Sequence, residues 1–292
     1  MARYREIRGR IVGIENTAKI TQAMKMVAAA KLRRAQDAII AARPYGRKLQ
    51  EILQYLATNM ETAVSPLLAE RDVERVCLVV VAADRGLCGP FNTNVLRAAT
   101  TLINGPLAEF QAAGKLDMVT IGKRAVDFFA KRNVNVVSAW PGIFNVLEFS
   151  TARTIVDELR NGFIERKYDQ VLVVYNEFKS VVKQNVVEMQ LLPIPRMEVS
   201  DTAPLLDYIF EPSQDELLDA LLPKHLNTQF WNVLLESNAA EQGARMTAME
   251  NATQNSKELV RTLRLQYNKA RQEAITKEIL EIVSGAEALS QQ

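Results

Sequence analysis

Residues 224–284 read KHLNTQFWNVLLESNAAEQGARMTAMENATQNSKELVRTLRLQYNKARQEAITKEILEIVS, with one glycine, Gly243, and no proline. Glycine and proline interrupt helices most often, so the stretch predicts a helix far longer than the average of about 11 to 12 residues. Upstream, Ser213 and Glu216 have the spacing of a capping box. Pro223 is expected to kink or restart the helix near its beginning. So long a helix needs lateral support from another element.

Residues 3–57 can supply that support. Their apolar and small residues recur at alternating spacings of four and three, as in a coiled-coil seam. The seam positions are Ile7, Ile11, Ile14, Ala18, Thr21, Ala28, Leu32, Ala35, Ile39, Ala42, Leu49, Leu53 and Leu56. Lys25 and Gly46 interrupt the seam, and Pro44 is expected to kink the helix or end its regular part. Since the first helix enters the middle region and the last leaves it, the two should pair antiparallel.

The last helix should extend beyond the first. It has roughly 24 more residues, which corresponds to about 36 Å at the rise of an α-helix. The extension starts near Tyr267, and one flank of it carries Ile275, Ile279, Ile282, Val283 and Leu289. An apolar stripe at the end of a single helix indicates a surrounding partner.

The middle of the chain alternates short, β-branched apolar runs with helical stretches. The expected strands are 73–83, 117–122, 134–140 and 169–175, and the expected helices are 93–113, 123–132 and 150–167. This alternation predicts a mostly parallel sheet covered on both faces. A further antiparallel edge is expected from 179–185 and 186–192. The predicted fold class is α/β: a Rossmann-like domain over 73–200 and a long antiparallel coiled coil of helices 1–57 and 213–292.

The formal net charge of +2 conceals an uneven distribution. Residues 1–48 carry twelve basic and three acidic groups, or +9, and residues 257–292 carry six and five, or +1. The remaining 49–256 have eighteen basic and twenty-six acidic groups, or −8. A basic arm on an acidic body points to an acidic partner, and a solvated helix face is the alternative.

Several classes of protein are disfavoured by composition. Two cysteines, Cys77 and Cys88, make neither a disulfide framework nor a four-thiolate zinc site. No run approaches the roughly 18 to 20 apolar residues of a membrane span, and the charged start MARYREIRGRIVG is unlike a secretory signal. A soluble protein of a reducing compartment is expected.

The loop DRGLCG at 84–89 follows a predicted strand and precedes a helix, where nucleotide phosphates bind in many α/β proteins. It lacks both the Walker spacing and the dinucleotide glycine triplet. A tight turn that needs Gly86 and Gly89 for backbone freedom is the preferred interpretation.

Other catalytic candidates are weak. Cys88 lies beside Arg85 and near a helix start, features that lower a thiol pKa, but no histidine is near in sequence. His225, the single histidine, has no partners with metal-ligand spacing and is expected to be an ordinary helix-surface residue. No active site, cofactor or metal is therefore expected.

Four motifs are similar to those of a known family. Residues 14–28 (IENTAKITQAMKMVA), 84–92 (DRGLCGPFN), 244–253 (ARMTAMENAT) and 267–286 (YNKARQEAITKEILEIVSGA) resemble the γ subunit of F-type ATP synthases, in the expected order. The resemblance implies a non-catalytic rotor shaft standing inside a ring of three α and three β subunits, with the globular domain against the ε subunit and the membrane c-ring. Proton-driven rotation of the shaft would then move each β subunit through its states.

The resemblance also implies roles for particular residues. Contacts with β subunits are expected for Met24, Lys25, Arg245, Gln272, Thr276 and Glu278. The basic arm, expected to face acidic lever loops of β, comprises Arg8, Arg10, Lys19, Lys31, Arg33 and Arg34. Tyr208 is expected near the c-ring and ε.

The family further implies a peripheral position on the cytoplasmic side of a bacterial inner membrane. Redox switching is not expected, because the plant segment that carries a cysteine pair has no counterpart here. Two alternatives compete with the shaft. One is a nucleotide-binding α/β protein with coiled-coil oligomerisation arms. The other is a basic nucleic-acid binder, which the few aromatics and the acidic body disfavour.

Overall fold

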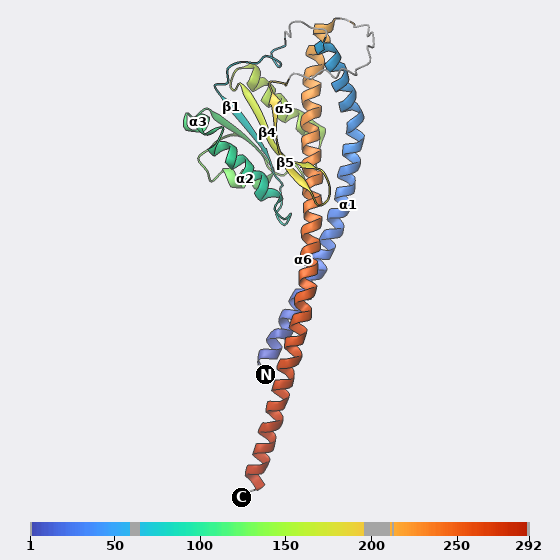
Figure 1. The fold of residues 1–292 in the computed structure, drawn as a ribbon, viewed down its shortest axis with the longest axis vertical. Coiled ribbons are helices and arrows are strands. Elements are labelled where there is room, and N and C mark those ends of the chain that lie inside the picture. Colours follow the sequence, from blue (N-terminus) through green and yellow to red (C-terminus); the bar gives the residue numbers. More distant parts are fainter. Residues whose placement is uncertain (1, 59–64, 196–210, 212, 291–292) are drawn as a thin grey trace. The chain divides into compact units, whose positions relative to one another are not determined.

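The computed structural model describes residues 2–58, 65–195, 211 and 213–290 (Figure 1). Two compact units make up the chain. One comprises residues 29–245, and the other combines residues 1–28 with 246–292.

A five-stranded sheet forms the centre of the larger unit, in the order β3-β2-β1-β4-β5. Its strands are β1 (Val76–Val81), β2 (Leu116–Ile121), β3 (Asn135–Trp140), β4 (Gln170–Phe178) and β5 (Gln184–Leu192). The first four are parallel, with Val76 of β1 beside Leu116 on one side and Gln170 on the other. β5 runs antiparallel to β4. The predicted α/β class and the mostly parallel sheet are confirmed.

The antiparallel edge differs from the prediction in one respect. Residues 179–183 form a turn, and β5 pairs with β4 from Val171 to Phe178 rather than with a strand over 179–185. The Ser180 amide donates to the Lys183 carbonyl at 3.0 Å, and the Lys183 amide donates to Ser180 Oγ at 3.1 Å. Val181 and Val182 suggested a strand, but Val182 lies on the turn and is 83% exposed.

The helices of the α/β body are α2 (Phe91–Asn104), α3 (Ala108–Ala112), α4 (Lys123–Phe129) and α5 (Phe149–Ile164). The expected single helix over 93–113 is broken between α2 and α3. Gly105 and Pro106 stand at the break, where the Gly105 and Leu107 amides both donate to the Leu102 carbonyl. Proline cannot continue a helical hydrogen-bond ladder, so the sequence itself explains the interruption.

The sheet is covered on both faces, as predicted. Alternate residues of β1 point to opposite sides, so Val76, Leu78 and Val80 pack with α2, α3 and α4. Cys77, Val79 and Val81 instead pack with α5 and with the parts of two long helices that belong to this unit. The body is therefore built onto those helices through a shared core.

The two long helices are α1 (Ala2–Thr58) and α6 (Gln214–Ser290), of 57 and 77 residues. Pro44 and Pro223 lie inside them without ending either one. At the start of α6 the Glu216 amide donates to Ser213 Oγ at 3.3 Å, which is one half of the predicted capping box. None of the helices in the described residues contains a segment apolar enough to cross a membrane.

Candidate functional site: the helix pair and its attachment

The smaller unit consists of the first part of α1 and the last part of α6, which run antiparallel. Contacts that step forward along α1 step backward along α6. The Tyr4 and Tyr267 rings meet edge to face with centroids 6.2 Å apart, and Glu15 pairs with Arg264 at 2.7 Å. Further on, Thr21 Oγ1 lies 2.7 Å from Thr253 Oγ1. In the larger unit Leu32, Ala35 and Ile39 likewise pack on Leu235 and Ala239.

The predicted seam on α1 matches the burial of its side chains. Thr21, Ala28, Leu32, Ala35, Ile39, Leu49, Leu53 and Leu56 are buried, and the other seam residues are half-buried. Apolar residues off the seam, such as Val12 and Ile20, are exposed by 50% and 60%. The two interruptions have explanations. Lys25 reaches across to the Glu250 carboxylate of α6, and Gly46 lies beside Thr228 and Asn232.

The extension of α6 past Tyr267 is confirmed within this unit. Since Tyr4 lies near the start of α1 and contacts Tyr267, the residues that follow have no α1 residues opposite them in the described part of the chain. Ile275, Ile279, Ile282 and Val283 are 47%, 55%, 71% and 47% exposed. These four residues are called the tip stripe below. Leu289, expected on the same flank, has a side chain outside the described part.

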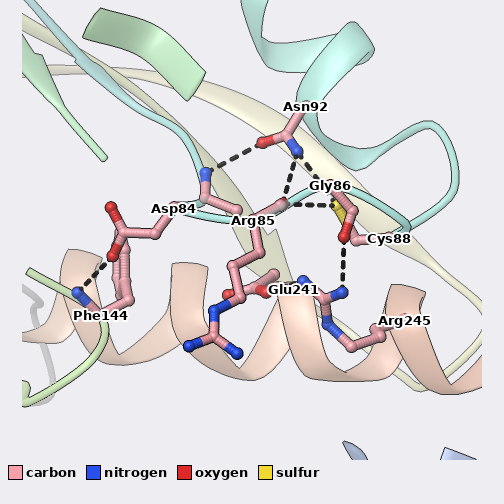
Figure 2. Close-up of polar contacts among 9 residues, drawn as sticks. Asp84, Arg85, Gly86, Cys88, Asn92, Phe144, Glu241 and Arg245 are labelled. Atoms are coloured by element: carbon pink, nitrogen blue, oxygen red, sulfur yellow. Dashed lines mark hydrogen bonds and ion pairs between the residues drawn. The ribbon is translucent and has the colours of Figure 1, made fainter. Parts of the chain in front are cut away.

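The larger unit holds the loop 84–92, which joins β1 to α2 and which two side chains stabilise (Figure 2). Asp84 accepts backbone hydrogen bonds from Lys123 at 2.8 Å, Gly142 at 2.6 Å and Phe144 at 2.9 Å. Its carboxylate thus joins three loops at the carboxyl ends of β1, β2 and β3. Asn92 is the second side chain that stabilises the loop. Its Oδ1 accepts a hydrogen bond from the Ala83 amide at 2.9 Å.

Asn92 and the glycines also shape the loop tip. The Asn92 amide nitrogen donates to the Arg85 carbonyl at 3.2 Å and to Cys88 Sγ at 3.1 Å. Gly89 has φ +58°, which confirms its need for backbone freedom. Gly86 was also expected to be needed for backbone freedom, and this expectation was wrong. Its φ is not positive, and a Cβ there would instead lie 2.6 Å from the Arg124 guanidinium.

In this sheet order, ligands of α/β proteins bind at the carboxyl ends of β1 and β4, where the strand order reverses. Helix α6 fills that place. Ala240 and Ala244 are buried against Cys88 and Phe91 of the loop and α2. Gly243 also permits the close approach, because a Cβ there would lie 3.3 Å from the Phe178 ring at the end of β4.

Arg245 closes this contact. Its guanidinium donates to the Gly86 carbonyl at 2.6 Å and pairs with Glu241 one turn earlier on α6 (Figure 2). Both side chains are nearly buried, with 11% and 7% exposed. The nucleotide crevice of the fold is therefore occupied by the protein's own helix, a geometry that disfavours the nucleotide-binding alternative.

The titratable groups near the crevice do not resemble a reactive site. Burial raises the pKa of the Cys88 thiol, although the Arg245 guanidinium acts in the opposite direction. The expected lowering of the Cys88 pKa by Arg85 is thus not found. Burial also raises the pKa of Cys77 and lowers that of His225, which is half-buried on α6. Across the described ranges, no three His, Cys, Asp or Glu side chains gather to hold a metal ion.

The predicted partner-contact residues fall into three environments. Gln272, Thr276 and Glu278 are exposed on α6, and Met24 and Lys25 are half-buried on α1. Arg245 is buried and bonded within the chain, as described above. Their contacts with β subunits stay a prediction.

The basic arm is exposed throughout: Arg8, Arg10, Lys19, Lys31, Arg33 and Arg34. Arg10 pairs locally with Glu6 at 2.9 Å. Tyr208 lies outside the described residues. Sequence reasoning missed the roles of Asp84 and Asn92. It also missed Glu241, although its spacing of four from Arg245 is a recognisable ion-pair signal.

The geometry defines a class of protein. Its larger unit is an α/β body whose nucleotide crevice is closed by a long helix, and its smaller unit is an antiparallel helix pair. Comparison with known proteins makes this specific. A family model described as ATP synthase matches residues 3–289. The ATP synthase gamma chain of Chloroherpeton thalassium is 50% identical over 302 residues, covering 100% of this chain and 99% of that one. That of Chlorobaculum parvum is 50% identical over 292 residues, covering all of both chains.

Solved structures agree. A chain in the mitochondrial ATP synthase central stalk and c-ring of Tetrahymena thermophila is similar with a TM-score of 0.58 and 25% identity, covering 80% of this chain and 99% of that chain. A chain of the Euglena gracilis mitochondrial ATP synthase has the same fold, with a TM-score of 0.70 and 20% identity over 99% of this chain and 95% of that one. The chain belongs to the ATP synthase gamma-chain family.

Proposed function

We propose that this chain is the rotor shaft of an F-type ATP synthase, a stalk subunit that transmits rotation and is not itself the catalyst. The observation that carries the proposal is the tip stripe. A long α6 continues beyond its α1 partner and exposes apolar side chains at 47% to 71% where no described residue of the chain covers them. A bearing formed by a ring of α and β subunits would cover such a surface.

The helix pair suits the transmission of force. Its outward faces differ around the axis, because α1 exposes basic side chains such as Arg8 and Lys19, whereas the end of α6 exposes the tip stripe. A shaft with unlike faces can make different contacts with each β subunit and so bias each toward a different state. We assign contacts with β subunits to Met24, Lys25, Arg245, Gln272, Thr276 and Glu278, and contacts with acidic lever loops to the basic arm.

The remaining partners and the location follow from the same assignment. The α/β body would bind the ε subunit and the c-ring, and Tyr208 belongs to that contact. The chain would be peripheral on the cytoplasmic side of a bacterial inner membrane, held there through the complex. The proton would be the driving ion.

The tip stripe provides a direct test. Ile275→Gln and Ile279→Gln together should reduce the torque of a complex reconstituted with α and β subunits, because polar groups replace the covered apolar surface. Deletion of 275–292 should reduce it further or impair assembly while the α/β body stays folded. Glu273→Gln with Glu281→Gln is the matched control on the same exposed helix and should leave torque unchanged. Equal torque in the stripe variant and the control would contradict the bearing.

A further inference from the structure

A groove lies between α2 and α4 on one face of the larger unit, with a cavity volume of about 1100 Å³. One stripe of α2, from Asn92 to Asn104, lines one wall, and residues of α4 and of the turn after it line the other. Helix α2 has 14 residues, which is about 21 Å at the rise of an α-helix. The lining includes Phe128, which is half-buried, Leu96, which is 8% exposed, and threonines of α2.

The charges around this groove are uneven. Its lining contains four cations, Arg97, Arg124, Lys131 and Arg132, and the single acid Asp127. All five are exposed. Within the part of the chain that the structure describes, none of the four cations pairs with a carboxylate.

This arrangement contrasts with that on α5. On α5 the cations have acidic neighbours, as Arg153 and Arg160 both approach Asp157, at 3.7 and 3.1 Å. Moreover, residues 49–256 together carry −8. A local excess of unpaired positive charge on an acidic body indicates a surface that meets an anionic partner.

We propose that the α2–α4 groove docks an acidic amphipathic helix of a partner protein. A helix of three to four turns matches the length of the α2 wall. Its apolar face would cover Leu96, and its acidic flanks would meet Arg97 and Arg124 on opposite walls. A nucleic acid fits less well, because Phe128 is the one aromatic ring in the lining and the Arg132 guanidinium, 3.3 Å from its centroid, already covers one face of that ring.

This proposal does not depend on the shaft function. The groove lies entirely within the α/β body, so the full chain can be tested for binding without any other subunit. The probe is a fluorescein-labelled designed helix of about 14 residues, with leucines on one face and glutamates on its flanks. Two companion peptides carry glutamine or lysine in place of glutamate. Fluorescence anisotropy with the full chain measures the Kd of each.

The glutamate peptide should bind in a saturable manner and more tightly than the glutamine and lysine peptides. Each exposed ion pair contributes about 1.4- to 5-fold in Kd, and charge reversal adds repulsion of similar size. Arg97→Glu with Arg124→Glu should therefore weaken binding at least about fourfold. Arg153→Glu with Lys167→Glu on the α5 side, which changes the total charge equally, should stay within about twofold.

Three results would overturn the proposal. One is the lack of saturable binding of the glutamate peptide up to about 1 mM. Another is an equal loss of affinity in the groove variant and the α5 control, which would mean that only net charge matters. The third is tighter binding of a single-stranded oligonucleotide that the groove variant abolishes, which would assign the surface to nucleic acid.

Discussion

The buried pair of Arg245 and Glu241 makes a quantitative prediction about how α6 is held in the crevice. With 11% and 7% of their side chains exposed, both charges have lost most of their contact with water. Replacing Arg245 with methionine leaves the Glu241 carboxylate buried without its cation. Breaking a buried pair in this way costs about 3 to 5 kcal/mol. The same change also removes the only described partner that donates to the Gly86 carbonyl at 2.6 Å.

The double variant separates the pair from the packing around it. Arg245→Met with Glu241→Leu leaves no unpaired charge, and replacing a buried pair with apolar residues is often nearly neutral. We expect the double variant to recover most of the loss, to within about 1 to 2 kcal/mol of the parent. A control, Lys123→Met with Asp127→Leu on the exposed face of α4, should change stability by no more than about 0.5 kcal/mol.

Urea unfolding followed by tryptophan fluorescence provides the assay. The chain has two tryptophans, Trp140 and Trp231, and both lie in the larger unit that contains the pair. The signal therefore reports on the unit in question. If Arg245→Met cost less than about 1 kcal/mol, or if the double variant lost the sum of the two single losses, the reasoning about the buried pair would be wrong.

Three other predictions concern single positions. Asp84→Ala removes an acceptor of hydrogen bonds from three backbone amides. It should lower the free energy of unfolding by about 2 to 4 kcal/mol in the same assay, and a loss below about 1 kcal/mol would refute the role of Asp84. Thr253→Val removes a buried hydroxyl bonded to Thr21 and should cost about 1 kcal/mol in helix melting followed by circular dichroism, whereas the double variant with Thr21→Val should cost no more. Burial lowers the pKa of His225, so the unfolded chain binds a proton more readily and stability should fall as the pH drops below about 6.5. In His225→Gln, the part of the difference in unfolding free energy between pH 7.5 and pH 5.5 that comes from His225 should disappear from urea titrations. If that difference is unchanged in the variant, His225 is not its source.

Much of the helix pair could be predicted because its signal is local. The spacing of Ile11, Ile14, Ala18 and Thr21 identifies the buried face of α1 without knowledge of any other element. The position of Tyr267 at the end of the pairing follows from helix lengths alone. Strands were found for a similar reason, since buried parallel strands are continuous β-branched runs such as VCLVVV in β1.

The parts that could not be predicted depend on contacts between distant residues. Arg245 and Gly86 are 159 positions apart, and nothing near either one in the sequence indicates that α6 fills the crevice. The backbone amides that Asp84 binds in the other two loops are likewise up to 60 residues away in the sequence. Local signals also misled at the sheet edge, because Val181 and Val182 have high strand propensity but lie where the chain turns.

The central claim is that the chain rotates as a shaft while ATP is consumed by its neighbours. The most direct measurement attaches a marker to the α/β body in a complex reconstituted with α and β subunits, anchors the subunit ring to a surface and follows the marker by single-molecule microscopy. If the chain is the shaft, the marker should rotate stepwise and in one direction when ATP is added. A complex that hydrolyses ATP while the marker stays still would contradict the claim.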